Sequence, residues 1–128
     1  MDNGFTELLD IGSLDRFLAQ SSNVPVVIFK HSETCGISDR AYREMQKLAE
    51  PRMTNSNERP IAGIPIGIVG VQAAPDVSNE VEARTGVAHE SPQVFVLLAG
   101  QLVWSASHGG VRAEAVEQAV RDAVSSGQ

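Results

Sequence analysis

The chain has 128 residues and a formal charge of −6 at pH 7, with 42% hydrophobic and 20% charged residues. That length suits one domain, and the composition is typical of a packed core rather than of a disordered chain. The acidic charge, with no stripe of Lys and Arg, argues against nucleic acid and against an anionic membrane surface as partners. We therefore expect a single domain over residues 1–128 that binds neither nucleic acid nor membrane.

No apolar run is long enough to span a bilayer, and the opening MDNGFTELLD lacks the basic start and apolar centre of a signal peptide. The chain also holds a single cysteine, so no disulfide can form within it. These features predict a cytoplasmic protein whose thiol stays reduced. If that thiol takes part in redox chemistry, its disulfide partner has to come from another molecule.

The first elements expected are a helix, a buried strand and a second helix. Ser13 is the expected N-cap of a helix over residues 14–21, LDRFLAQS. Residues 24–31, VPVVIFKH, form the continuous β-branched run of a central strand that is buried on both faces. A turn with the only cysteine, Cys35, follows. Residues 36–49 predict a helix, because their apolar side chains recur at helical spacing.

The middle of the chain predicts a loop, a strand and a helix. Residues 50–63 are polar and include two prolines, which indicates a loop. Residues 64–71, IPIGIVGV, predict a second buried strand. Residues 75–86 predict a helix with its N-cap at Asp76 or Ser78.

The last part of the chain predicts a hairpin and a closing helix. Gly86 is placed to end the preceding helix, since glycine adopts the left-handed C-terminal conformation without strain. Residues 92–107 predict two strands about a turn at Ala99–Gly100. Residues 109–127 predict an Ala-rich amphipathic helix.

The resulting order of elements, α β α β α β β α, predicts an α/β protein. Two strands that bracket a helix should be parallel with a right-handed crossover, and the last strand should turn back along the third. We expect a thioredoxin-like fold: a four-stranded mixed sheet flanked by helices, with an added N-terminal helix.

The position of Cys35 decides the predicted chemistry. A thiol at the first turn of a helix faces free backbone N–H groups and the positive end of the helix dipole, and both favour the reactive thiolate. Ser38, about one turn later, can donate to the sulfur but cannot resolve a mixed disulfide, and Gly36 leaves the sulfur accessible. Lys30 and His31 would add positive potential if they face the turn. The alternative is a buried, inert cysteine, against which the small and polar neighbours argue.

A second feature, HESPQVFVL, supports the same chemistry. In thioredoxin-like proteins a cis-proline begins the third strand beside the active cysteine, and the residue before it offers its backbone to an incoming peptide or thiol. Ser91–Pro92 stands at that place. Only about 5–6% of X–Pro bonds are cis in folded proteins, so the prediction of a cis bond here depends on the fold.

The segments FKHSETCGIS, HESPQVFVL and LVWSASHGGV, in this order, resemble the monothiol bacilliredoxins, the YtxJ-like thioredoxin-fold proteins. The resemblance extends from about Ser13 to the last helix. Members are bacterial and cytoplasmic, and they are taken to remove bacillithiol from client cysteines. The resemblance therefore implies exchange with client proteins that carry bacillithiol mixed disulfides, a low-molecular-weight thiol such as bacillithiol as co-substrate, and no metal or other cofactor.

The same resemblance implies the site residues. Cys35 matches the nucleophile and Ser38 the non-resolving fourth position, so these are the expected catalytic residues. The expected substrate-binding residues are Thr34, Gly36, Ser91 and Pro92. Trp104 and His108 match the VW and HG of the last strand and the following turn. Gly36 stands where the family commonly has proline. The reduction potential of Cys35 and the stability of its thiolate are therefore not assumed to be those typical of the family.

Two other functions remain open at this stage. CGIS is one residue away from the CGFS of monothiol glutaredoxins, which share an iron–sulfur cluster between two subunits. A non-catalytic adaptor on the same scaffold is the second alternative, because a fold does not determine a function. A Cys35 pKa below about 7 would favour exchange chemistry, and one near 8.5 the adaptor.

The remaining polar motifs are less specific. His31, His89 and His108 are too scattered in sequence for a recognisable metal site. The segment SHGGV, before the last helix, either binds an anion such as a bacillithiol carboxylate at a helix N-terminus or forms a plain tight turn.

Overall fold

In the computed structural model the described residues are 5–32, 36–49 and 64–126, and of residues 36–39, 49 and 126 the backbone alone is described. The loop expected at 50–63 lies outside the described residues, as do Thr34 and Cys35. Among the helices described, none combines the length and the apolarity that crossing a bilayer requires.

One mixed sheet forms the centre of the structure, with the strand order β1-β3-β2-β4-β5. The strands are β1 (Thr6–Glu7), β2 (Val26–His31), β3 (Ile66–Gly70), β4 (Gln93–Leu98) and β5 (Gln101–Ser107). β1 and β2 both pair parallel with β3, whereas β4 pairs antiparallel with β2 and with β5. The expected sheet had four strands. The additional strand is β1, whose two residues are too few to show a strand period in the sequence.

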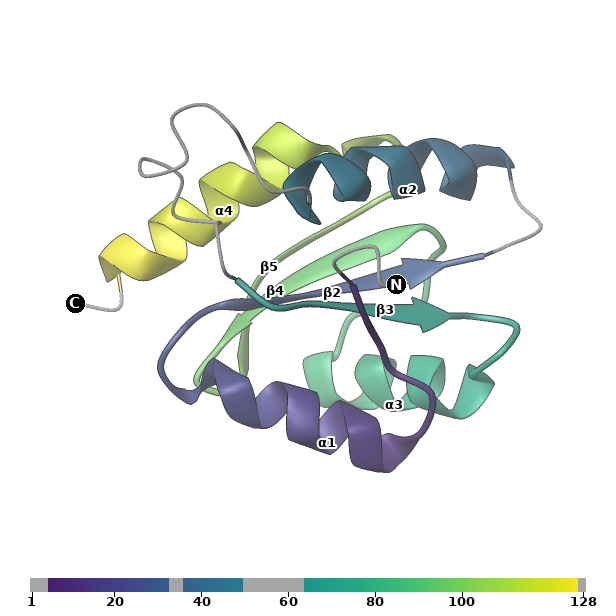
Figure 1. Cartoon of the computed structure of the whole chain (residues 1–128), viewed down its shortest axis with the longest axis horizontal. Coiled ribbons are helices and arrows are strands. Elements are labelled where there is room, and N and C mark those ends of the chain that lie inside the picture. Colours follow the sequence, from purple (N-terminus) through teal and green to yellow (C-terminus); the bar gives the residue numbers. More distant parts are fainter. Residues whose placement is uncertain (1–4, 33–35, 50–63, 127–128) are drawn as a thin grey trace.

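Among the described residues, four helices enclose this sheet in two layers (Figure 1). They are α1 (Ile11–Ala19), α2 (Gly36–Ala49), α3 (Pro75–Thr85) and α4 (Ala113–Ser126), with short 3₁₀ turns η1 (Gln20–Ser22) and η3 (His108–Gly110). Helices α2 and α4 cover one face, and α1 and α3 cover the other. The expected order and layering of the elements are confirmed.

Two hydrophobic cores lie on the two faces of the sheet, and β2 contributes side chains to both of them. Val27 and Phe29 belong to the core under α2 and α4, while Val26 and Ile28 belong to the core under α1 and α3. All four side chains are at most 1% exposed. The unbroken apolar run of β2 follows from this placement, because a strand covered on both faces has no side that favours polar residues.

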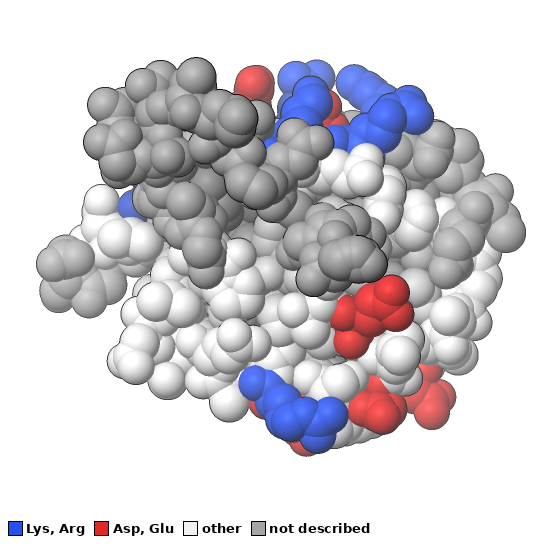
Figure 2. All heavy atoms as spheres, in the orientation of Figure 1, with Lys and Arg blue, Asp and Glu red and all other residues white. Residues whose placement is uncertain are grey.

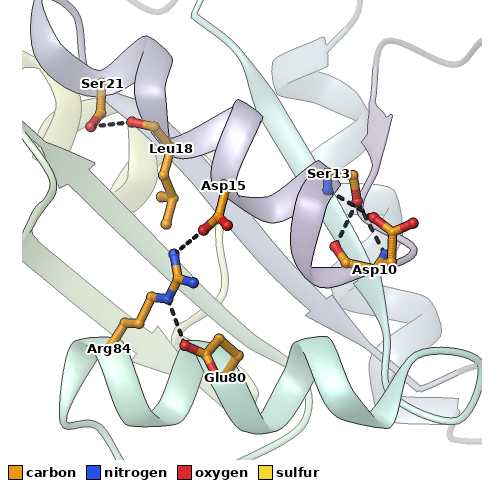
Figure 3. A network of polar contacts seen from close by, with 7 residues as sticks. All are labelled: Asp10, Ser13, Asp15, Leu18, Ser21, Glu80 and Arg84. Carbon is orange, nitrogen blue, oxygen red and sulfur yellow. Dashed lines mark hydrogen bonds and ion pairs between the residues drawn. The ribbon is translucent and has the colours of Figure 1, made fainter.

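The two helices of the second face begin differently from what the sequence predicts. The N-cap of α1 is Asp10 rather than Ser13: Asp10 Oδ1 accepts from the Ser13 N–H at 2.8 Å, and the Ser13 hydroxyl accepts from the Asp10 N–H at 3.1 Å (Figure 3). This reciprocal capping box places Ser13 three residues inside. Helix α3 starts at Pro75, after Ala74, so neither Asp76 nor Ser78 caps it. Proline is favoured at a first helical position because its missing N–H is not needed there.

The ends of α3 and of the hairpin agree with the sequence. Gly86 follows α3 with φ of 75°, the left-handed conformation expected of it. Ala99 and Gly100 join β4 to β5 with φ of 55° and 76°.

On the face of the sheet covered by α1 and α3, an ion pair joins these two helices. Arg84 of α3 bonds to Glu80 at 2.8 Å and to Asp15 of α1 at 2.7 Å (Figure 3).

Candidate functional site

One end of the sheet brings the connection from β2 to α2 close to the start of β4, which lies about 60 residues later in the sequence. β2 ends at His31, α2 begins at Gly36, and β4 begins at Gln93 directly opposite Lys30 of β2. The end of β2, after which Cys35 follows four residues later in the sequence, therefore lies beside the start of β4, which Ser91 and Pro92 directly precede. Because Gly36 is the first residue of α2, Cys35 immediately precedes the helix, as expected.

The peptide bond between Ser91 and Pro92 is cis, which confirms the expectation drawn from the fold. Pro92 is buried and Ser91 half-buried. The Ser91 hydroxyl oxygen is shielded from solvent and has no hydrogen-bond partner among the described residues. Buried hydroxyls are usually paired, so this oxygen marks a polar position at the start of β4.

The side chain of Gln93 binds the segment before the cis-proline. This side chain is 2% exposed. Its Nε2 donates to the Ala88 carbonyl at 3.0 Å, and its Oε1 accepts from the Glu90 N–H at 3.2 Å. An amide with both a donor and an acceptor can bind a strand-like backbone at two points, so Gln93 holds residues 88–90 in place.

His108 also binds the segment around the cis-proline. Its backbone N–H donates to the Pro92 carbonyl at 2.9 Å, and its Nε2 donates to the Glu90 carboxylate at 2.7 Å. The residue adopts φ of 54° at the start of η3. His108 thus connects the end of β5 to both sides of Ser91, a role that the sequence did not predict.

The His31 ring lies at the end of β2 against aromatic side chains. Its centroid is 5.0 Å from that of Tyr42, on α2, and 5.7 Å from that of Phe29. A pocket of about 290 Å³ opens beside the His31 and Tyr42 rings and extends to Gly70 and Glu7. Its volume is near the lower limit for small-ligand sites.

Trp104, matched by resemblance to the last strand, is half-buried and packs against the core under α2 and α4. That placement agrees with a structural role. Of Gly36 and Ser38 the backbone alone is described, so the hydrogen bond from the Ser38 hydroxyl to the Cys35 sulfur stays a prediction.

Helix α2 carries several positive charges on its surface, although the net charge of the chain is −6. Figure 2 shows Lys and Arg side chains gathered at the edge where α2 runs. The exposed cationic residues of α2 are Arg40, Arg43 and Lys47. Arg40 is in the second turn of α2, where a positive charge adds to the helix dipole in favouring an anion such as a thiolate, whereas Lys47 is in the last turn and pairs with Glu44.

The anion site considered at SHGGV has an internal occupant. Glu44 of α2 accepts from the Ala113 N–H, at the start of α4, with its Oε1 at 2.8 Å. That hydrogen bond, and the one from Lys47, lower the pKa of Glu44 below its ordinary value of 4.5. The residues before α4 form the η3 turn. A carboxylate of the protein itself therefore occupies a helix N–H that an external anion would need, which favours the plain-turn interpretation.

Residues 6–116 match the family described as monothiol bacilliredoxin BrxC. The chain belongs to the monothiol bacilliredoxin family. Among the described residues, no group of three or more His, Cys, Asp and Glu side chains could hold a metal ion.

Solved structures agree with the fold of this bacilliredoxin. A protein described as having a thioredoxin fold is 29% identical, with a TM-score of 0.75, over 91% of this chain and 93% of its own. Thioredoxin from Trypanosoma brucei brucei is 13% identical, with a TM-score of 0.70, over 94% of this chain and 91% of its own. Thioredoxin from Fasciola hepatica is also 13% identical, with a TM-score of 0.68, over 92% and 98%. Family and fold together support a thiol redox function for this bacilliredoxin.

Two polar residues at the end of the sheet have contacts that the sequence did not predict: Lys30, which it suggested only as a positive charge facing the turn, and Gln93, to which it gave no role. Both are at most 2% exposed. Each stands within or beside an apolar strand, in VVIFKH and QVFVLL. Since polar side chains are rarely buried without partners, a Lys or Gln inside such a run is a signal of an internal contact.

Proposed function

We propose that this bacilliredoxin is a monothiol exchange protein that removes bacillithiol, or a similar low-molecular-weight thiol, from the cysteines of client proteins. The observation that carries the proposal is the juxtaposition at the end of the sheet. A cis Ser91–Pro92 bond lies beside the end of β2, and a helix begins one residue after Cys35. This arrangement supports an activated thiol next to a backbone that can receive a partner.

In the proposed reaction the Cys35 thiolate attacks the bacillithiol sulfur of a client mixed disulfide. The disulfide bond of the client breaks, the client cysteine leaves as a thiolate, and a new disulfide joins Cys35 to bacillithiol. A free thiol of a second molecule then attacks this disulfide and regenerates the Cys35 thiolate. No electrons are gained or lost in the first step, because one disulfide replaces another.

The other site residues are assigned supporting roles. The Ser38 hydroxyl donates to the Cys35 sulfur and stabilises its thiolate, as charge-assisted hydrogen bonds do. Ser91 and Pro92, together with Thr34 and Gly36, bind the incoming mixed disulfide. We further propose that the protein works in the cytoplasm, where the reducing thiol is available, and that its partners are bacillithiolated client proteins.

The test is intact mass spectrometry after mixing the protein with a bacillithiolated client. We expect the bacillithiol adduct to appear on the wild-type protein while the client returns to its free-thiol mass. Cys35→Ala should neither gain the adduct nor release the client. A wild-type Cys35 that stays unmodified beside a blocked client would refute the proposal.

A second measurement examines Ser38. Ser38→Ala should raise the pKa of Cys35, because the thiolate loses a donor while the thiol does not. The expected result is slower alkylation of Cys35 at pH 6 with little change at pH 9. Equal alkylation rates at pH 6 would remove Ser38 from the site.

A further inference from the structure

Lys30 is a buried cation in the middle layer of the protein, and the exchange reaction proposed above does not use it. Its side chain is 0% exposed. It lies on the same face of β2 as Val26 and Ile28, toward α3, because side chains alternate along a strand. An ammonium group in such a place is destabilising unless other groups compensate its lost hydration.

Two groups in the described part of the chain compensate the charge of Lys30. Its Nζ lies 3.3 Å from Nδ1 of His89 and 5.6 Å from the ring centroid of Phe95. Burial lowers the pKa of Lys30 below its ordinary value of 10.5, and the charge of Glu82 on α3 opposes that shift. His89 therefore provides the hydrogen bond that the buried amine has at its tip, and the Phe95 ring provides a cation–π contact.

His89 is held at one nitrogen by two buried groups. Its Nδ1 lies 3.4 Å from the hydroxyl of Ser78, a residue of α3 that is 2% exposed. A protonated Lys30 has only donors, so Nδ1 accepts from it and the ring carries its proton on Nε2. The residue is otherwise exposed. The ring thus fixes an exposed loop to the interior of the protein.

That loop leads directly into the cis-proline. His89 lies two residues before Ser91, and its neighbours Ala88 and Glu90 are the two residues that Gln93 binds. Lys30 and Gln93 are opposite each other on β2 and β4, so they approach the loop from the same face of the sheet. Removal of the amine would leave Nδ1 of His89 with the hydroxyl of Ser78 at 3.4 Å but without the shorter contact to Lys30.

We propose that Lys30 is a positioning residue for thiol exchange: its buried amine holds the His89 ring and, through it, places Ser91–Pro92 where the mixed disulfide of a client binds. The proposal rests on the proposed function. Lys30 acts through the loop and does not contact the reacting sulfur atoms.

A comparison of Lys30→Met, His89→Ala and the double variant tests this coupling. Methionine has a similar length and no charge, so Lys30→Met should leave the folded state equally or more stable. Both single variants should slow exchange with a bacillithiolated client about five- to tenfold, and the double variant should be no slower than either. Alkylation of Cys35 by iodoacetamide should not change, because that reaction needs no contact with Ser91–Pro92.

The matched control is Ile28→Met, which places the same side chain on the same face of β2. This variant should exchange thiols with the client at the wild-type rate, because it leaves Lys30 and His89 in contact. Hydrogen exchange gives a readout that needs no client. In Lys30→Met the amide of Glu90 should exchange faster, whereas that of Val87, bound to Thr85 at 3.2 Å, should change little.

The outcomes separate the two proposals. A wild-type protein that fails to exchange thiols overturns the proposed function, while the Glu90 amide still tests whether Lys30 holds the loop. Two results would overturn the role of Lys30. One is a hydrogen-exchange rate of the Glu90 amide in Lys30→Met that equals that of the wild type. The other is a loss of thiol-exchange rate in the double variant that equals the sum of the two single losses. Slower alkylation in Lys30→Met would also overturn it, because the amine would then act on the sulfur rather than on the loop.

Discussion

The carboxylate of Glu44 joins two helices that are separated by a large part of the chain. It accepts from the Ala113 N–H at 2.8 Å and forms an ion pair with Lys47 at 2.9 Å. A negative charge at a helix N-terminus is favourable because it meets unpaired N–H groups and the positive end of the dipole. Glu44 therefore caps α4 from α2, and its ionised form should contribute to stability.

Replacement of Glu44 by Gln should expose this contribution as a pH dependence. Gln keeps an acceptor oxygen but not the charge, so we expect a loss of about 0.5–1 kcal/mol at pH 7. Because the folded state lowers the pKa of Glu44 from its ordinary 4.5, the advantage of the wild type is complete above that value. It is lost as the pH falls through the lower, folded pKa.

Urea denaturation of both proteins at pH 7 and at pH 3 measures this difference. The carboxylate of Asp10, whose pKa is also lowered by its bonds to Ser13, is common to both proteins and cancels. A gap in stability that is the same at both pH values would contradict the assignment.

At the scale of the structural element, the hairpin of β4 and β5 has backbone strain at Ala99 in its turn. Ala99 and Gly100 both have positive φ, which a two-residue turn of type I′ requires. Glycine adopts this conformation freely, whereas alanine does so at a cost of about 1 kcal/mol. The turn is also fixed from outside, since Ser21 accepts from the Ala99 N–H with its carbonyl and from the Gly100 N–H with its hydroxyl.

Ala99→Asn should therefore stabilise the protein by about 0.5–1 kcal/mol, because Asn–Gly is the favoured pair in this turn. Ala99 is exposed, so the new side chain disturbs no packing. Ala99→Val is the opposite control and should destabilise, since a β-branched residue tolerates positive φ poorly. Thermal unfolding of the three proteins measures their order of stability, which should be Asn variant, wild type, Val variant. A Val variant more stable than the wild type would refute the argument.

At the scale of the whole molecule, the sheet is covered on both faces, and at Gly67 of β3 the side chains of Leu8 and Phe17 pack tightly against the strand backbone. A Cβ there would lie 2.8 Å from Leu8 Cδ1 and 3.1 Å from the Phe17 ring. Leu8 and Phe17 are at most 2% exposed, so neither side chain has room to move. Glycine at this position thus allows the N-terminal segment and α1 to pack against the sheet.

Gly67→Ala should destabilise the protein by about 1–3 kcal/mol through overpacking. Gly12→Ala provides the matched control, since a Cβ at Gly12 of α1 would come no closer than 3.5 Å to its neighbours. That substitution should stabilise by up to about 1 kcal/mol, because alanine favours the helix. Opposite shifts of the unfolding midpoint are expected. Equal shifts would mean that the crowding at Gly67 is relieved by movement.

The sequence by itself determined the elements, their order and the thioredoxin-like layering, because hydrophobic periodicity and turn residues act between near neighbours. It also placed Cys35 directly before a helix, and it predicted the cis bond at Pro92 once the fold was inferred. Helix 36–49 has the expected bounds, and Gly86 ends α3 as expected.

Only the tertiary structure decided which distant groups meet. Glu44 caps a helix that begins 69 residues later, and Lys30 reaches a histidine 59 residues away. The two-residue strand β1 exists only because β3 offers it a free edge. Such contacts depend on the packing of whole elements, whose relative positions no local pattern encodes, and the one between Lys30 and His89 reaches the segment that leads into the cis-proline.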